Sequence, residues 1–151
     1  MLMKRCFFIG HSDASMDILS DLTASIRQHI TKFGVSEFIV GNYGNFDRLA
    51  THAVKTAKQT FPDIKLTLLL PYYPTKNTDF LTMGFDDTLS PSDIEYVPKR
   101  LAIIYANRYM VDHSDYLIAY SYYPGSNSRK ILEYAKNREK EGLISVCNLY
   151  K

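Results

Sequence analysis

The chain has 151 residues, of which 46% are hydrophobic and 23% are charged, and its formal net charge is +2. This length and composition are typical of one globular domain with a full hydrophobic core, while the small charge argues against nucleic acid or an anionic membrane as partner. Cys6 and Cys147 lie far apart without zinc-ligand spacing, and the apolar run 6–9 is too short for a signal peptide or membrane span, so we expect a cytoplasmic, metal-free protein.

Strands and helices alternate along the first half of the chain. Residues 5–9 predict a strand, because residues 6–9 form an apolar run. Residues 14–33 carry apolar side chains at a four-residue step, which predicts a helix. Residues 37–40 predict the second strand, because Phe38 to Val40 are aromatic or β-branched, as in a buried strand. Residues 46–60 again have helical periodicity, and Pro62 is expected to end that helix.

The middle of the chain is less regular. Residues 65–70 predict a third strand, but residues 75–91 are polar and rich in turn formers. A connection of that length in a compact domain is often a functional loop or lid. We expect Asp86 and Asp87 to lie on this loop in solvent.

The last four elements complete an α/β pattern. Residues 92–113 and 128–140 predict helices, and residues 116–120 and 143–147 predict strands. Alternating strands and helices call for a parallel sheet with helices on both faces, a doubly wound Rossmann-like fold. The simplest arrangement has five strands in the order 3-2-1-4-5.

One stretch, residues 38–47, reads as a buried strand, a glycine turn and the start of a helix. Gly41 and Gly44 allow a sharp turn with open backbone N–H groups, and Asn45 is a candidate cap for a helix beginning near Phe46. Open N–H groups and the helix dipole together favour anions. The stretch is therefore either a phosphate or nucleotide cradle or a tight turn without a ligand.

Three strand-to-helix turns are expected to share one crevice. In an open α/β sheet, ligands bind beyond the carboxyl ends of the strands, where the strand order reverses. The turns after the first, second and fourth strands meet there. The residues expected to bind a ligand are Gly10, His11, Gly41, Asn42, Tyr43, Gly44, Asn45, Asp47, Gly125, Ser126, Asn127 and Ser128.

Several of these side chains have more than one chemical interpretation. Ser126 to Ser128 offer hydroxyl, amide and backbone N–H groups to a phosphate. Asp47 either binds ribose hydroxyls or helps to cap its helix. His11 is a phosphate ligand, a general acid/base or a turn residue. The GxSxG, GxxxxGK[ST] and GxGxxG motifs are missing from the sequence, which argues against an ordinary dehydrogenase or P-loop ATPase.

Many segments, in chain order, resemble the SLOG superfamily, which includes the LOG proteins and the core of the DNA-processing protein DprA. The resemblance covers nearly the whole chain and is carried by residues 7–11, 40–50, 70–72, 107, 110–112 and 114–120. It implies one Rossmann-like domain over residues 1–151 that binds a nucleotide or nucleotide derivative. It implies no further cofactor.

The LOG enzymes of this superfamily release the base from a nucleoside 5′-monophosphate with a PGGxGTxxE motif and an arginine on the preceding helix. Here the motif begins as Pro124-Gly125, but Ser126 and Ser128 replace glycines. Leu132 stands at the glutamate position, with Glu133 one residue later. The resemblance therefore implies nucleotide binding more directly than LOG-type hydrolysis.

Three functions follow as hypotheses. The first is a nucleotide-binding or nucleotide-sensing protein. The second is a nucleoside 5′-monophosphate phosphoribohydrolase in which Glu133, with His11 or Arg108, replaces the catalytic pair, since Ala106 stands at the arginine position. The third is a protein-interaction scaffold, a homodimer formed through some of the twelve tyrosines. The same tyrosines are equally suited to stacking on a base.

Overall fold

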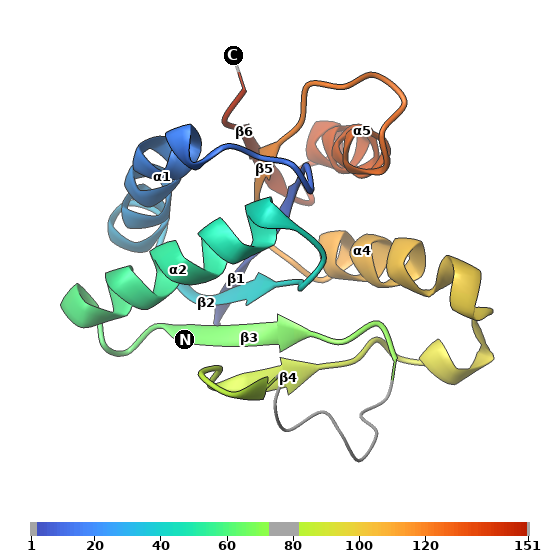
Figure 1. The fold of residues 1–151 in the computed structure, drawn as a ribbon, viewed down its shortest axis with the longest axis horizontal. Coiled ribbons are helices and arrows are strands. Elements are labelled where there is room, and N and C mark those ends of the chain that lie inside the picture. Colours follow the sequence, from blue (N-terminus) through green and yellow to red (C-terminus); the bar gives the residue numbers. More distant parts are fainter. Residues whose placement is uncertain (1–2, 73–81, 151) are drawn as a thin grey trace.

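A computed structural model describes residues 3–72 and 82–150 and places a parallel sheet at the centre of the protein (Figure 1). Within these residues the sheet has six strands in the order β4-β3-β2-β1-β5-β6. The strands are β1 (Lys4–Gly10), β2 (Val35–Val40), β3 (Lys65–Leu69), β4 (Asp87–Leu89), β5 (Tyr116–Tyr120) and β6 (Ser145–Asn148). The α/β class is as predicted, but the expected five strands and their order are wrong because β4 forms an additional edge.

Four α-helices lie within the described residues: α1 (Leu19–Thr31), α2 (Asn45–Thr60), α4 (Ala102–Asp112) and α5 (Asn127–Lys140). The helix expected over residues 14–33 is shorter, because Ser15 caps a separate 3₁₀ turn, Met16–Ile18, by accepting a hydrogen bond from the Asp17 N–H at 3.2 Å. The helix expected over residues 92–113 likewise begins as two 3₁₀ turns before α4.

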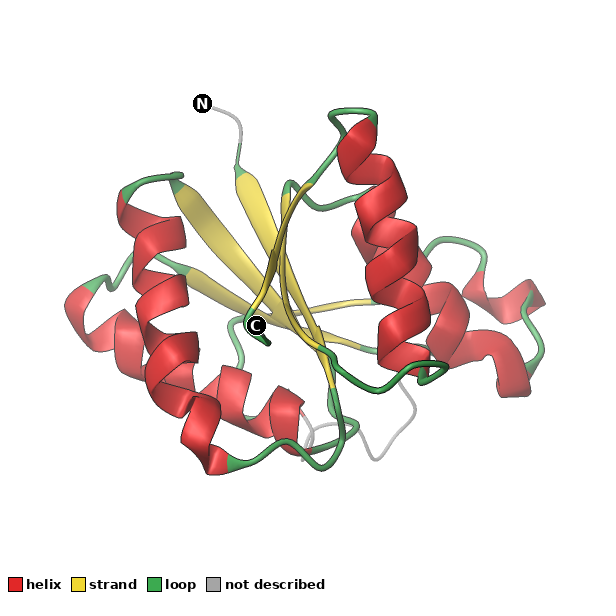
Figure 2. Ribbon diagram, turned by 90° about the horizontal axis from the view of Figure 1, so that it is seen from above, coloured by secondary structure: helices red, strands yellow, loops and turns green. Residues whose placement is uncertain are grey.

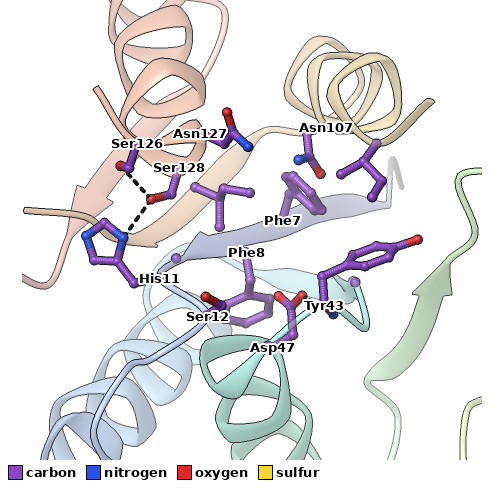
Figure 3. A pocket seen from close by; sticks show the side chains of 15 residues that line it. Phe7, Phe8, His11, Ser12, Tyr43, Asp47, Asn107, Ser126, Asn127 and Ser128 are labelled. Carbon is purple, nitrogen blue, oxygen red and sulfur yellow. Dashed lines mark hydrogen bonds between the residues drawn. The ribbon is translucent and has the colours of Figure 1, made fainter. Parts of the chain in front are cut away.

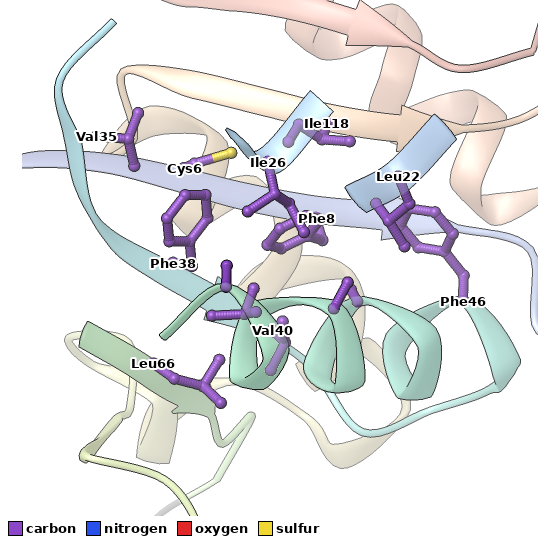
Figure 4. Close-up of a cluster of buried hydrophobic side chains, with 14 of the residues drawn as sticks. Cys6, Phe8, Leu22, Ile26, Val35, Phe38, Val40, Phe46, Leu66 and Ile118 are labelled. Atoms are coloured by element: carbon purple, nitrogen blue, oxygen red, sulfur yellow. The ribbon is translucent and has the colours of Figure 1, made fainter. Parts of the chain in front are cut away.

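The helices cover both faces of the sheet, as Figure 2 shows from above. Side chains alternate between the faces of a strand. Phe8 and Phe38 pack with α1 and α2 in one core cluster (Figure 4), whereas Phe7 and Ile39 pack with α4 and α5 in the other. Because the central strands are buried on both faces, their sequences are continuously apolar rather than alternating.

Asp86 and Asp87 are both exposed to solvent, as expected, but Asp87 lies in the edge strand β4 and not in a loop. The Asp86 carboxylate accepts hydrogen bonds from the Leu66 N–H at 2.8 Å and from Lys58 Nζ at 2.7 Å. Asp87 begins β4 and pairs with Lys65 at 2.9 Å. Residues 75–81 of the expected loop lie outside the described residues, as does Tyr73.

Candidate functional site

A cavity of about 330 Å³ lies at the carboxyl ends of the central strands (Figure 3). β1 pairs with β2 on one side and with β5 on the other, so the strand order reverses at β1. This is the place where open α/β sheets bind their ligands. The walls come from the end of β1, the glycine turn and first turn of α2, one face of α4, and the first turn of α5.

The N-terminus of α2 is held against the loop that follows β1. Gly44, not Asn45, occupies the cap position of the helix, and the Asn45 N–H donates to the Ser12 carbonyl at 2.9 Å. A Cβ on residue 44 would lie 2.4 Å from the Ser12 Cα, so this approach requires glycine. The sequence-based expectation that Asn45 caps a helix starting at Phe46 is therefore wrong.

Asp47 projects its carboxyl group from the first turn of α2 into the cavity. One oxygen, Oδ2, accepts a hydrogen bond from the Tyr43 N–H at 3.0 Å. Burial raises the pKa of Asp47 from 3.8 to about 6, and the Tyr43 hydrogen bond offsets part of that rise. The cavity therefore contains a carboxyl group that accepts a hydrogen bond and whose pKa is raised to about 6.

The N-terminus of α5 forms the opposite wall. Ser126 caps this helix, because its Oγ accepts a hydrogen bond from the Arg129 N–H at 3.1 Å. No acceptor within the described parts of the chain bonds to the backbone N–H of Asn127 or Ser128. Two open N–H groups at the positive end of a helix dipole are suited to an anion such as a phosphate.

His11 ties the end of β1 to the loop between β5 and α5. Its Nε2 accepts hydrogen bonds from the backbone N–H groups of Tyr122, at 2.8 Å, and Tyr123, at 3.2 Å. Nε2 therefore carries no proton, and the ring proton lies on Nδ1, which is 3.0 Å from Ser128 Oγ. Burial lowers the pKa of His11, against an opposing effect of Asp13, so the ring is neutral near neutral pH.

This proton arrangement determines what the His11–Ser128 pair can do. A serine nucleophile needs a base that takes its proton. Here the imidazole donates its own proton to Ser128 Oγ, and its lone pair is already used by two backbone donors. The pair therefore positions the first turn of α5 rather than activating a nucleophile.

We expect His11→Ala to lower the free energy of unfolding by about 1–3 kcal/mol, because it leaves the Tyr122 and Tyr123 N–H groups without their acceptor. Urea denaturation measures the change. His52→Ala is the matched control, since His52 is exposed on α2. An unfolding midpoint for His11→Ala equal to that of His52→Ala would show that the bonds to His11 contribute nothing.

Most of the expected ligand-binding residues line this cavity, and three do not. Gly10, His11, Gly41, Tyr43, Gly44, Asp47, Ser126, Asn127 and Ser128 line it. Asn42 lies in an adjoining hollow, beside Arg48, that shares Gly41 and Asp47 with the cavity. Neither Asn45 nor Gly125 is part of the cavity wall.

The candidate catalytic residues are not brought together. Glu133 is 62% exposed and pairs with Arg129 at 3.3 Å. The Arg108 guanidinium lies over the Tyr134 ring, 5.4 Å from its centroid. Of the three candidates only His11 borders the cavity.

The residues expected to bind a ligand do not include Ile103 or Asn107, although both line the cavity. Ile103 and Asn107 are four residues apart on α4 and therefore share one helix face. That spacing is visible in the sequence. The spacing alone does not show that this helix face points toward the ends of β1 and β2, because that depends on how α4 packs on the sheet.

No protein-family model matches the chain, and no curated protein matches its sequence. Among the described helices, none is both long and apolar enough to cross a membrane. Residues 3–72 and 82–150 contain no cluster of three or more histidine, cysteine, aspartate or glutamate side chains arranged to hold a metal ion.

Proposed function

We propose that this protein binds a nucleotide or a nucleotide derivative, as a holding or sensing protein of the SLOG type. The observation that carries the proposal is the meeting of two helix N-termini, those of α2 and α5, at one cavity beside the strand β1. An anionic group bound there meets open N–H groups and the positive ends of helix dipoles. The Asp47 carboxyl and the Asn107 amide add hydrogen-bonding groups for hydroxyls.

The positions that carry the SLOG resemblance support this proposal. Residues 7–11 include the end of β1, and residues 40–50 include the glycine turn and the first turn of α2. Both segments supply cavity walls, as does residue 107. The resemblance therefore coincides with the candidate site rather than with the hydrophobic core alone.

We propose binding in preference to hydrolysis. The groups that were candidates to replace a LOG-type catalytic pair do not converge, since Glu133 and Arg108 lie outside the cavity wall and both His11 ring nitrogens are engaged. Among the tyrosines, Tyr122 and Tyr123 pack against His11, with ring centroids 4.4 and 4.8 Å from it, and so support the site.

The direct test is a thermal-shift panel of AMP, GMP, ADP-ribose, NAD and cyclic nucleotides. A ligand present at a hundred times its dissociation constant stabilises the native state by about 2.7 kcal/mol, which is a visible shift. Chromatography of the same mixtures separates holding from cleavage. A panel without any shift would contradict the proposal.

We expect Ser126→Asp to weaken nucleotide binding at least about tenfold, whereas Ser126→Asn retains it. Both side chains cap helices well and have the same size, so both variants are expected to fold. Only the aspartate places a negative charge at the anion-binding end of α5. Isothermal titration with the best ligand of the panel measures the difference. Equal affinities for the two variants would show that the anion lies elsewhere.

A further inference from the structure

Several large apolar side chains are exposed near the start of α4. Leu101 is 42% exposed, Ile103 is 44% exposed and Ile104 is 37% exposed. Tyr96, in the preceding 3₁₀ turn Ile94–Tyr96, is 80% exposed. In Figure 1, α4 and the turns before it lie at one margin of the molecule. Exposed apolar groups that gather in this way mark an interaction surface.

The exposed face of α4 has a regular pattern. Arg100, Ile103, Ile104, Asn107 and Arg108 are spaced by three- and four-residue steps, so they share one face of the helix and of the 3₁₀ turn that leads into it. Neither isoleucine belongs to a hydrophobic core cluster of the described residues. Isoleucine is β-branched and forms helices less readily than leucine, glutamine or lysine. Neither the core nor the helix therefore explains two adjacent isoleucines at this position.

A cavity of about 570 Å³ opens beside this face. Ile103 forms part of its wall, and Tyr72, Ile94 and Val97 supply further apolar wall. This cavity is larger than the one at the candidate site and is lined mainly by apolar side chains. Protein interfaces are dominated by a few apolar or aromatic anchors that fill such pockets. The cavity thus has room for an anchor side chain of a partner.

The charges on and beside the exposed face have one sign. Residues 96–111 contain no acidic side chain but include Lys99, Arg100 and Arg108. Within residues 3–72 and 82–150, none of these three cations forms a salt bridge. Glu95 is the acidic member of the cavity wall. Carboxylates of a partner would find cations here that no carboxylate of the chain already neutralises.

We propose that α4 and the second cavity form a docking surface for an acidic amphipathic segment of another protein. An apolar side chain of that segment fills the cavity, its apolar face covers Ile103 and Ile104, and its carboxylates pair with Arg100 and Arg108. Amphipathic helices bind apolar grooves in this way. The arginines select this occupant, because an apolar face alone does not distinguish partners by charge. The inference goes beyond nucleotide binding and does not depend on it.

A pair of synthetic peptides tests the charge preference. One is an amphipathic helix of about 18 residues with leucine and one phenylalanine on its apolar face and glutamate on the other, and its counterpart has lysine in place of every glutamate. Fluorescence anisotropy of the labelled peptides measures their binding to the full chain. We expect the glutamate peptide to bind at least about tenfold more tightly than the lysine peptide, and less tightly as salt is added.

Ile104→Gln tests the apolar contact. Ile104 lines neither cavity and lies outside the core clusters, and glutamine is a good helix former, so the variant is expected to fold. We expect it to bind the glutamate peptide at least about fivefold more weakly than the native chain does. Leu143→Gln is the matched control, because Leu143 is 50% exposed in the turn before β6. This control is expected to bind like the native chain.

A charge-reversed variant tests the arginines. The double substitution Arg100→Glu and Arg108→Glu is expected to reverse the preference, so that the lysine peptide binds more tightly than the glutamate peptide. Arg27→Glu is the control, since Arg27 is exposed on α1, which packs on the other face of the sheet. It is expected to keep the preference for the glutamate peptide. Thermal unfolding verifies that each variant is folded.

Several results would overturn the proposal. The first is equal affinity of the native chain for the two peptides, and the second is an unchanged affinity in Ile104→Gln. Self-association of the native chain in sedimentation, lost in Ile104→Gln, would assign the surface to a second copy of the chain. Binding to phosphatidylserine vesicles without binding to either peptide, lost in the charge-reversed variant, would assign it to an anionic membrane.

Discussion

Asp47→Asn is expected to increase the free energy of unfolding at about pH 7.5 by up to about 3 kcal/mol. The native pKa of Asp47 is raised from 3.8 to about 6 by burial in the cavity wall. Above pH 6 the native state must therefore hold a carboxylate in a place that disfavours its charge. Asparagine keeps the shape and still provides an oxygen for the Tyr43 N–H.

The pH dependence of this effect has a definite sign. Below about pH 4 the Asp47 carboxyl is protonated in both native and unfolded states, so its ionisation does not favour either state. Between 3.8 and about 6 the unfolded state loses its proton first, and the contribution of Asp47 to stability declines as the pH rises. The advantage of Asp47→Asn therefore grows across this window and is constant above it.

Urea denaturation of both proteins at several pH values measures the difference. Asp21→Asn is the matched control, because Asp21 is an exposed acidic residue in the first turn of α1. A gain at neutral pH that does not shrink toward pH 4 would contradict the assignment to Asp47 ionisation. The same variant must also be tested for nucleotide binding, since a carboxyl group that destabilises the fold is typical of a functional site.

The second large effect is expected where β1 meets α2. Phe46 is fully buried against Phe8 and Tyr120, with ring centroids 6.4 Å away in each case. Its ring passes so close to Gly10 that a Cβ there would lie 2.3 Å from Phe46 Cγ. We expect Phe46→Ala to cost about 3–5 kcal/mol by leaving a cavity, and Gly10→Ala to cost about 1–3 kcal/mol by overpacking.

A double-mutant cycle distinguishes this steric conflict from a general loss of stability. Combining Gly10→Ala with Phe46→Leu removes part of the ring that the new methyl group meets, so the double variant is expected to be more stable than the sum of single effects by about 1 kcal/mol or more. Gly10→Ala with Val54→Ala, farther along α2, is the control and should be additive. Additivity in both pairs would contradict the close contact.

The sequence predicts the α/β class well, because the central strands are continuously apolar and the segments between them have helical periodicity. Phe7 and Phe8 are both buried only if helices cover the two faces of β1. The sequence does not predict β4. This strand has three residues and begins with aspartate, which is rare in strands. What places Asp87 there is pairing with β3 and with Lys65, which are tertiary contacts.

The sequence predicts where the candidate site lies better than it predicts the hydrogen bonds that its side chains make. The glycine-containing turns that follow the strands predict the region of the cavity, and most of the residues expected to bind a ligand line that cavity. The role of His11 was not readable from sequence, because it depends on donors from Tyr122 and Tyr123, more than a hundred positions away. Only the pairing of β1 with β5 brings those donors to the imidazole.

The pairing of β1 with β5 also determines when, during folding, the candidate site forms. The walls draw on residues from Phe7 to Ser128, and β1 meets β5 only after the intervening chain has closed into a loop. During synthesis, the N-terminal strands β1, β2 and β3 can assemble while the N-terminus of α5 is still missing. We expect a ligand of this cavity to need the completed chain and, by contacting the N-termini of both α2 and α5, to slow unfolding more than it speeds folding.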